Sequence, residues 1–361
     1  VEYTVLDKNN ISSNFIDKDK RIKITQIENY FSCPFKHFAS YGLKLVENRD
    51  GDIKANDFGN FLHDFCNLIV RMGSKKLGTY DDKTLGLEIE KCFSKLVNSE
   101  KYSILKDDEN AFVCKLLKNE VKRFGTFLNY EQKCSDFKIF KTEYKFDNSL
   151  CVNLNNENYS IVGIVDRVDK YDKYLRVIDY KTGSLAGSNA KIDNLYYGTK
   201  IQVYVYLKAL TEIFDAKPFG AFYLPNLSAF SLEGTDDYKL SGYFIDDAAL
   251  CQHADKNLLE ENKSRLFDVA FSTSKKNIEN NIKSIVSRKK VTTDQLKGML
   301  DYSVKIIKQA LDEIIKGNIE PSPINDSCKF CPYKDVCGHD ENISRKKMGS
   351  VEAKTFEVKY E

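Results

Sequence analysis

Two short segments of the sequence place acidic and basic side chains where strands would hold them together. In LRVIDYKTG, Asp179 and Lys181 are two positions apart, and alternate side chains of a strand share one face. In IVGIVDRVD, Asp166 lies among Val and Ile, where an ionised carboxylate is costly unless it binds a cation or a donor. If these strands pair through a turn at residues 171–173, Asp166 comes near Asp179, and a divalent cation would relieve their repulsion.

Such a pair of carboxylates could bind Mg²⁺ or Mn²⁺. Lys181 would then be left to orient an attacking water and to stabilise charge on a phosphate. The alternative is a surface hairpin with an ordinary ion pair, because D-x-K alone is a very short motif. The chemistry therefore depends on which other side chains accompany the pair.

Two helices that the apolar spacing predicts, at residues 57–72 and 200–214, carry polar pairs one turn apart. Gly59 and His63 share a face of the first helix, and the glycine leaves space in front of the imidazole. Gln202 and Tyr206 share a face of the second helix, whose other face is apolar. Each pair also has an ordinary explanation. His63 could be a packed core residue, and Gln202 and Tyr206 could form the more solvated face of their helix.

Three thiols near the end of the sequence follow the spacing C-x2-C-x5-C, at Cys328, Cys331 and Cys337. A site of this kind usually takes four ligands, and four thiolates suit tetrahedral Zn²⁺ as well as an iron–sulfur cluster, so spacing alone leaves both open. Six other cysteines lack partners at metal-ligand spacing, and we expect them to be buried apolar residues. They are Cys66, Cys92, Cys114, Cys134, Cys151 and Cys251.

The motifs GNFLH, GIVDRVD, VIDYKTG and QVYVY, in this order, resemble those of the RecB-like nucleases of the PD-(D/E)xK superfamily. The segment ITQIENYFSCPFKHFASYGLKL and the final cysteine run are similar to the C-terminal nuclease domain of the AddB/RexB subunits of ATP-dependent helicase-nucleases, which carry an iron–sulfur staple. The resemblance covers residues 23–340, and the combination of motifs is far more specific than any one of them.

The resemblance implies a role for each of these residues. It assigns the catalytic positions to His63, Asp166, Asp179, Lys181, Gln202 and Tyr206, and the metal ligands to His63, Asp166 and Asp179. It also implies that Cys33, in FSCPF, joins Cys328, Cys331 and Cys337 around a 4Fe-4S cluster. The cluster would close a loop of 295 positions (328 minus 33) and add to folding directly. Glu143 could be an outer carboxylate, although an exposed strand Glu explains it equally well.

The implied activity is metal-dependent hydrolysis of phosphodiester bonds in DNA, exonucleolytic on single strands, in double-strand break repair. The sequence contains no G-x-x-x-x-G-K-[ST] motif, so an ATP-driven motor must be a partner, in this family an AddA-type helicase subunit. Two alternatives remain: a free-standing RecB-like exonuclease of the CRISPR-associated or phage type, and a non-catalytic nucleic-acid binding module stabilised by zinc.

The composition of the chain indicates in which class of protein and in which compartment this chemistry would take place. The 361 residues are 42% hydrophobic and contain neither a run of 18 or more apolar residues nor the basic and apolar regions of a secretory signal at the start, so we expect neither a membrane span nor a secretory signal in them. Ten scattered cysteines favour the reducing cytoplasm. The sequence lacks an initiator Met, and we expect further sequence upstream.

Net charge is only +2, so any nucleic-acid surface must be local. The basic segment 274–298 is one candidate, and a solvated helical face is the other interpretation. Its basic residues are Lys275, Lys276, Lys283, Arg288, Lys289, Lys290 and Lys297.

The elements that must position these residues follow the order helices, sheet, helices. We predict helix at 24–45 with a break at Pro34, at 84–130 with a loop near KDDEN, and at 292–318 with Gly317 placed to end it, and period-two strands at 137–181 and 219–224. The fold class is α/β, with a mixed central sheet flanked by helices and a helical cap joined by the cluster. We expect a lead-in at 1–22, a nuclease domain at 23–340 (57–130 helical, 137–224 catalytic sheet, 291–340 helix and cluster segment) and a tail at 341–361.

Overall fold

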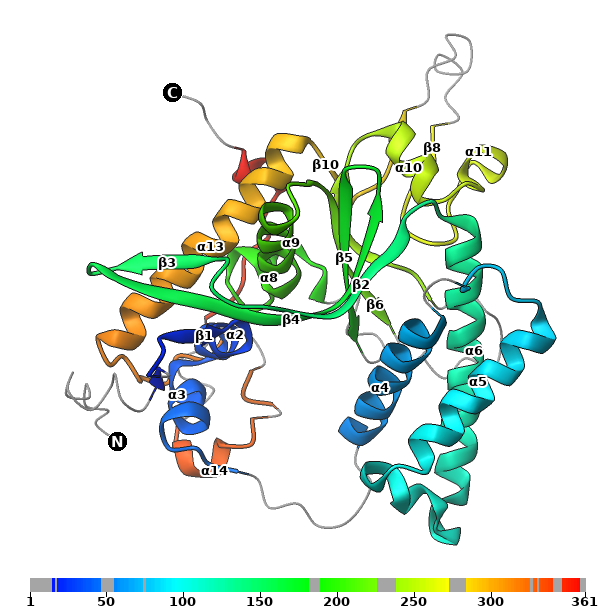
Figure 1. The fold of residues 1–361 in the computed structure, drawn as a ribbon. Helices are drawn as coiled ribbons and strands as arrows, with labels where there is room; N and C mark the ends of the chain where they lie inside the picture. Colours follow the sequence, from blue (N-terminus) through cyan, green and yellow to red (C-terminus); the bar gives the residue numbers. More distant parts are fainter. Residues whose placement is uncertain are drawn as a thin grey trace.

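The fold is taken from a computed structural model (Figure 1). The described residues are 15–16, 18–46, 55–73, 76–181, 189–225, 238–272, 284–324, 327–329, 331–339 and 346–357. Among the helices of these ranges, none is both long and apolar enough to cross a membrane.

An eight-stranded mixed sheet forms the centre, in the order β1-β4-β5-β6-β7-β10, with β2 and β3 also paired to β4. Strands β2, β3 and β5 run antiparallel to β4, whereas β5 and β6 are parallel. The mixed central sheet is therefore confirmed. The strands are β1 (Arg21–Lys23), β2 (Lys138–Phe146), β3 (Cys151–Leu154), β4 (Glu157–Tyr171), β5 (Tyr174–Lys181), β6 (Lys217–Pro225), β7 (Ser241–Ile245) and β10 (Lys290–Val291), with a separate pair β8 (Ala270–Phe271) and β9 (Ile285–Val286).

Two groups of helices flank the sheet, as Figure 1 shows. One group is α4 (Ala55–Gly73), α5 (Asp82–Val97) and α6 (Ala111–Cys134), with the short helices η2 (Glu100–Lys106) and η3 (Asp108–Asn110). The other contains α9 (Gln202–Ile213) and α13 (Thr293–Ile315). Helix α13 begins with a capping box between Thr292 and Gln295, and the predicted Gly317 follows its end with a φ of 79°.

Segments from the two ends of the described chain lie together (Figure 1). They are α2 (Ile24–Ser32), α3 (Pro34–His37) and the π-helical turn η1 (Phe38–Gly42) near the start, and α14 (Lys334–Cys337) near the end. The Ile324 amide donates to the Ser32 carbonyl at 3.0 Å, and Ser40 Oγ donates to Tyr333 Oη at 2.9 Å. The remaining helices are α8 (Ile192–Tyr196), α10 (Ala248–Ala254), α11 (Leu258–Glu261) and η4 (Ala353–Phe356).

Several boundaries differ from the prediction. The break predicted at Pro34 is confirmed, because Pro34 occupies the first position of the new helix α3, but the helical segment ends with η1 at Gly42 and not at residue 45. The sheet extends beyond residues 137–224, since the short strand β1 pairs with β4, and the short strands β7 and β10 continue the sheet beyond β6. Strand β1 begins at Arg21, inside the expected lead-in.

The basic segment does not form one helical face. Lys290 lies on β10, where its Nζ is 2.8 Å from Asp246 Oδ2, and Lys297 lies in α13. Lys289 Nζ donates to the Ala190 carbonyl at 2.6 Å and lies 4.6 Å from the centre of the Tyr243 ring. Residues 274–283 lie outside the described ranges. Lys289 and Lys290 are thus held by the fold itself.

Candidate active site

Strands β4 and β5 form the hairpin that the sequence predicts. Tyr171 pairs with Tyr174 across the turn, and Arg167 pairs with Ile178. One further step along this register sets Asp166 opposite Asp179. Asp166 Oδ2 accepts a hydrogen bond of 2.9 Å from the Tyr180 amide, so the backbone of β5 fixes the carboxylate of β4.

A histidine and two carboxylates converge beside this hairpin. His63 Nε2, on α4, is 3.1 Å from Asp166 Oδ2. Glu143 lies nearby on β2. One possible metal-ligand atom from each of His63, Asp166 and Glu143 lies within 4.8 Å of the other two. Burial opposes protonation of His63, but the hydrogen bond and charge of Asp166 outweigh it and raise the pKa of the imidazole. An imidazole nitrogen and two carboxylates at this spacing could bind a divalent cation.

Asp179 and Lys181 form an ion pair on the next strand, in which the carboxylate is buried and the lysine is half-buried. Lys181 Nζ is 2.5 Å from Asp179 Oδ2, and within the described residues this ion pair is the contact of that buried oxygen. Asp179 is 1% exposed. Burial raises the pKa of its carboxyl to about 7, against the opposing charge of Lys181 and with a further contribution from Asp166. A buried carboxylate with one poorly satisfied oxygen is suited to a cation.

Gln202 and Tyr206 pair with each other at the start of α9. Gln202 Nε2 donates to Tyr206 Oη at 2.8 Å, and the Tyr206 ring is buried. It packs against Gly163 of β4, where a Cβ atom would lie 2.6 Å from Tyr206 Cε1 and 2.8 Å from Phe146 Cε1. The glycine of GIVDRVD therefore admits the tyrosine beside the strand that carries Asp166.

Two polar residues at this site were missed by the sequence reasoning. Asn67 lies one turn after His63 on α4, and its side-chain amide lies 3.1 Å from His63 Nδ1, on the side of the ring opposite the Nε2 that faces Asp166. The helical spacing from His63 could have indicated Asn67. Glu28 on α2 caps the start of α9, and no sequence signal links positions that lie 173 residues apart.

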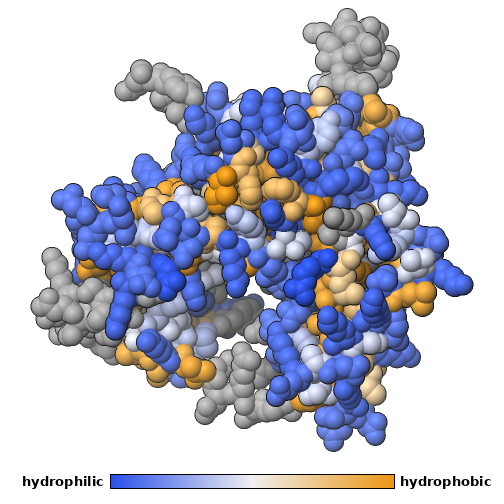
Figure 2. Space-filling model, viewed as in Figure 1, coloured by the Kyte–Doolittle hydropathy of each residue, from blue (hydrophilic) through white to orange (hydrophobic). Residues whose placement is uncertain are grey.

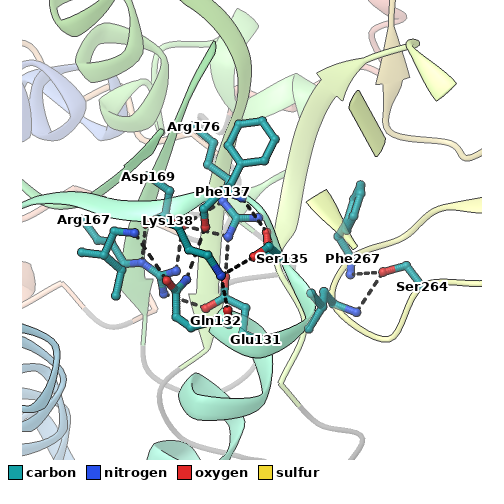
Figure 3. Close-up of polar contacts among 12 residues, drawn as sticks. Glu131, Gln132, Ser135, Phe137, Lys138, Arg167, Asp169, Arg176, Ser264 and Phe267 are labelled. Carbon is teal, nitrogen blue, oxygen red and sulfur yellow. Dashed lines mark hydrogen bonds and ion pairs between the residues drawn. The ribbon is translucent and has the colours of Figure 1, made fainter. Parts of the chain in front are cut away.

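The second aspartate of GIVDRVD faces away from this group. Asp169 joins Arg167, Arg176 and Glu131 in a quartet of ion pairs with fully buried side chains (Figure 3). Asp169 accepts hydrogen bonds of 2.7 Å from both Nε and Nη2 of Arg167. Glu131 accepts from Arg167 Nη1 at 2.8 Å and from Arg176 Nη2 at 2.7 Å, so it links the two arginines. Two positive and two negative groups balance. The quartet binds α6 to the back of the hairpin.

The four predicted cluster cysteines line one cavity between the two ends of the described chain. Cys33, Cys328, Cys331 and Cys337 border it, together with residues of the 321–339 segment and α3. Cys33 is buried and the other three are half-buried. Of the remaining cysteines, Cys66, Cys92, Cys134 and Cys251 are buried as predicted, and Cys114 is half-buried. The prediction is wrong for Cys151, which lies exposed on the short strand β3.

Comparison with known proteins gives a consistent result. The profile of the PD-(D/E)XK nuclease superfamily matches residues 21–338. The B subunit of the ATP-dependent helicase/deoxyribonuclease of Clostridioides difficile (strain 630) is 26% identical over 378 residues, which cover 94% of this chain and 32% of that protein. The corresponding B subunits of Exiguobacterium sibiricum (25%) and Clostridium botulinum strain Loch Maree (26%) match 92% and 96% of the chain and 32% of their own length. The chain spans about a third of these curated relatives.

Proposed function

This chain belongs to the PD-(D/E)XK nuclease superfamily, and from that premise we propose that it is a Mg²⁺- or Mn²⁺-dependent deoxyribonuclease acting exonucleolytically on single-stranded DNA. The observation that carries the proposal is the convergence of His63 and Asp166 beside the Asp179–Lys181 pair. Each of these side chains comes from a different position on α4, β4 or β5, so the fold itself assembles them.

The residues fit a divalent cation. His63, Asp166 and Glu143, whose ligand atoms lie within 4.8 Å of one another, would hold it. Asp179, which the resemblance assigns as a ligand, lies outside this group on the neighbouring strand β5 and would contribute its charge from there. Such a cation would supply charge neutralisation at the scissile phosphate and lower the pKa of a water. Lys181 keeps its proton, because the Asp179 charge raises its pKa against the effect of burial, and so presents a cation to the phosphate or to the attacking water.

Gln202 and Tyr206 support the geometry from α9. Their mutual hydrogen bond and the contact of Tyr206 with Gly163 keep this helix against the strand of Asp166. Figure 2 shows a hollow in the surface between the part that contains α2 and α3 and the part that contains α4 to α6. We propose that a single strand reaches the site along it.

We further propose that the cysteine cavity holds a 4Fe-4S cluster. A tetrahedral Zn²⁺ at about 2.3 Å from each sulfur needs thiolates about 3.8 Å apart. The cavity is bordered by four thiols, Cys33, Cys328, Cys331 and Cys337, the ligand number that either group takes. We favour the cluster because the spacing of these cysteines resembles that of the iron–sulfur nuclease domains.

The similar proteins are B subunits of ATP-dependent helicase/deoxyribonucleases, which suggests a partner for this chain. We propose that this chain is the nuclease part of such a subunit, that it works in the cytoplasm with an AddA-type helicase subunit, and that together they process double-strand breaks. The helicase would deliver the single strand.

The test is digestion of end-labelled single-stranded DNA with Mg²⁺ or Mn²⁺ by purified wild-type, Asp179→Ala and Lys181→Ala proteins. We expect both variants to lose cleavage and to keep DNA binding, because the changes remove cation and transition-state contacts and leave the phosphate-binding surface intact. Asp301→Ala, which removes a surface ion pair with Lys208, is the matched control and should cleave normally. Wild-type cleavage by Asp179→Ala would refute the proposal.

A further inference from the structure

A buried carboxylate from α2 caps the helix that carries Gln202 and Tyr206. Glu28 Oε1 accepts hydrogen bonds from the Ile201 amide at 2.8 Å and the Gln202 amide at 3.1 Å. Glu28 is 6% exposed. Helix α9 has no capping side chain of its own, because the residue before it is Ile201. The cap is therefore supplied from another part of the chain.

The first amides of a helix lack partners within the helix, and the helix dipole makes this end positive. A carboxylate satisfies both conditions at once, whereas most caps come from the residue directly before the helix. Lys200 Nζ, 3.6 Å from Glu28 Oε2, offsets the charge of the buried group. The position of α9 along its own axis is thus fixed by where α2 holds Glu28.

Glu28 also belongs to the segment that leads into the cysteine cavity. Its carbonyl accepts a hydrogen bond of 2.9 Å from Ser32 Oγ, in the last residue of α2, and Cys33 follows directly. The Ser32 carbonyl in turn receives the Ile324 amide from the segment that leads to the other three cysteines. One continuous set of contacts therefore runs from the cavity through α2 to the first turn of α9.

We propose that Glu28 is a positioning residue that fixes Gln202 and Tyr206 according to the placement of the cysteine-bearing helix α2. Ordering of the cysteine cavity holds α2, Glu28 holds the start of α9, and α9 holds the pair beside Gly163 and Asp166. The part of this inference that concerns cleavage rests on the proposed nuclease function. The part that concerns α9 does not.

The direct test is amide hydrogen exchange at Ile201 and Gln202. Glu28→Ala should lower protection at these amides about five- to tenfold, the factor that corresponds to loss of a typical helix cap. Glu28→Gln keeps a carbonyl acceptor and should retain most of the protection. Cys33→Ala should lower protection at the same amides, because it loosens α2. Unchanged protection in Glu28→Ala would overturn the inference.

The matched control is Asp247→Ala. It removes the cap of α10, where Asp247 Oδ1 accepts from the Ala249 and Leu250 amides, far along the chain from α9. Asp247→Ala should reduce stability comparably and leave protection at Ile201 and Gln202 unchanged. If it lowers that protection as much as Glu28→Ala does, general destabilisation explains the effect and the inference fails.

Cleavage kinetics provide the second measurement. Glu28→Ala should lower kcat for single-stranded DNA and leave KM nearly unchanged, Glu28→Gln should restore kcat, and Asp247→Ala should match wild type. If Glu28→Ala does not fold, Glu28→Gln decides alone: retained protection with kcat as low as a dead enzyme would overturn a positioning role. If even the wild type cleaves no DNA, the nuclease proposal fails, while loss of protection in Glu28→Ala still supports the cap.

Discussion

Replacing each aspartate of GIVDRVD by asparagine should produce opposite effects. Asp166→Asn keeps an acceptor for the Tyr180 amide and removes a like charge beside Asp179, so we expect a stable protein that does not cleave DNA. Asp169→Asn removes a charge from the buried quartet of Glu131, Asp169, Arg167 and Arg176, so we expect a destabilised protein whose site residues are intact.

The magnitude follows from the charge balance of the quartet. All four side chains are fully buried, and Asp169→Asn leaves two guanidinium groups facing one carboxylate. Breaking a buried ion pair from one side typically costs about 3–5 kcal/mol in the free energy of unfolding. For a chain of 361 residues the entropy of unfolding is roughly 0.76 kcal/mol per degree, so a loss of about 4 kcal/mol lowers Tm by about 5 °C.

The assay is thermal unfolding of the two single variants, together with cleavage measured well below the lower Tm. Asp169→Asn/Arg176→Gln restores the charge balance, because Glu131 and Arg167 still pair. We therefore expect the double variant to lose at least about 1 kcal/mol less than the sum of the single changes. Additive losses, or loss of cleavage by folded Asp169→Asn, would show that the quartet is not an independent structural unit.

Three further predictions address other parts of the chain. Cys33→Ala should lose the broad visible absorbance of an iron–sulfur cluster and become protease-sensitive at both ends, whereas full retention of iron and sulfide would exclude Cys33 as a ligand. Burial lowers the pKa of His37 to about 4, below its unfolded value of 6.5, so the neutral ring stabilises the fold fully above pH 6.5 and this contribution, up to about 3 kcal/mol, is lost as pH falls toward 4. In His37→Phe, the free energy of unfolding measured with urea should no longer fall in this way between pH 6.5 and pH 4. If it falls with pH as steeply as in the wild type, the prediction is wrong. Lys290→Gln should leave the salt dependence of DNA binding unchanged, because its ammonium is held by Asp246, while a slope reduced by about 0.7 would indicate a phosphate contact.

The sequence was sufficient to predict the helices and strands that carry the site, because their patterns are local. The period-two strands, the turn at residues 171–173 and the helical spacing of His63 and Gln202 all appear where they were expected. These features depend on residues at most a few positions apart. The approach of Asp166 to Asp179 also followed, because a short hairpin fixes its own register.

Contacts between distant elements could not be predicted in the same way. The alternation of side chains along GIVDRVD places Asp166 and Asp169 on opposite faces of β4. It does not show which face packs against α4 and which face packs against α6, whose Glu131 pairs with the two arginines. That choice depends on Glu131, which lies 36 positions before Arg167. Similarly, nothing in the sequence around Ile201 shows that its helix lacks a local cap and needs Glu28.

The site lies where β4 changes its partners. At Ser160 β4 pairs with β1 and β3 together, and at Arg167 it pairs with β2 and β5 together, so β1 and β5 share the edge opposite β2 and β3. On that shared edge the pairing of β1 ends at Val162 and that of β5 begins at Arg167. In the short interval between them, Gly163 admits the Tyr206 ring and the Asp166 side chain accepts the Tyr180 amide. Gly163 and Asp166 thus both lie on the part of β4 between its pairings with β1 and β5.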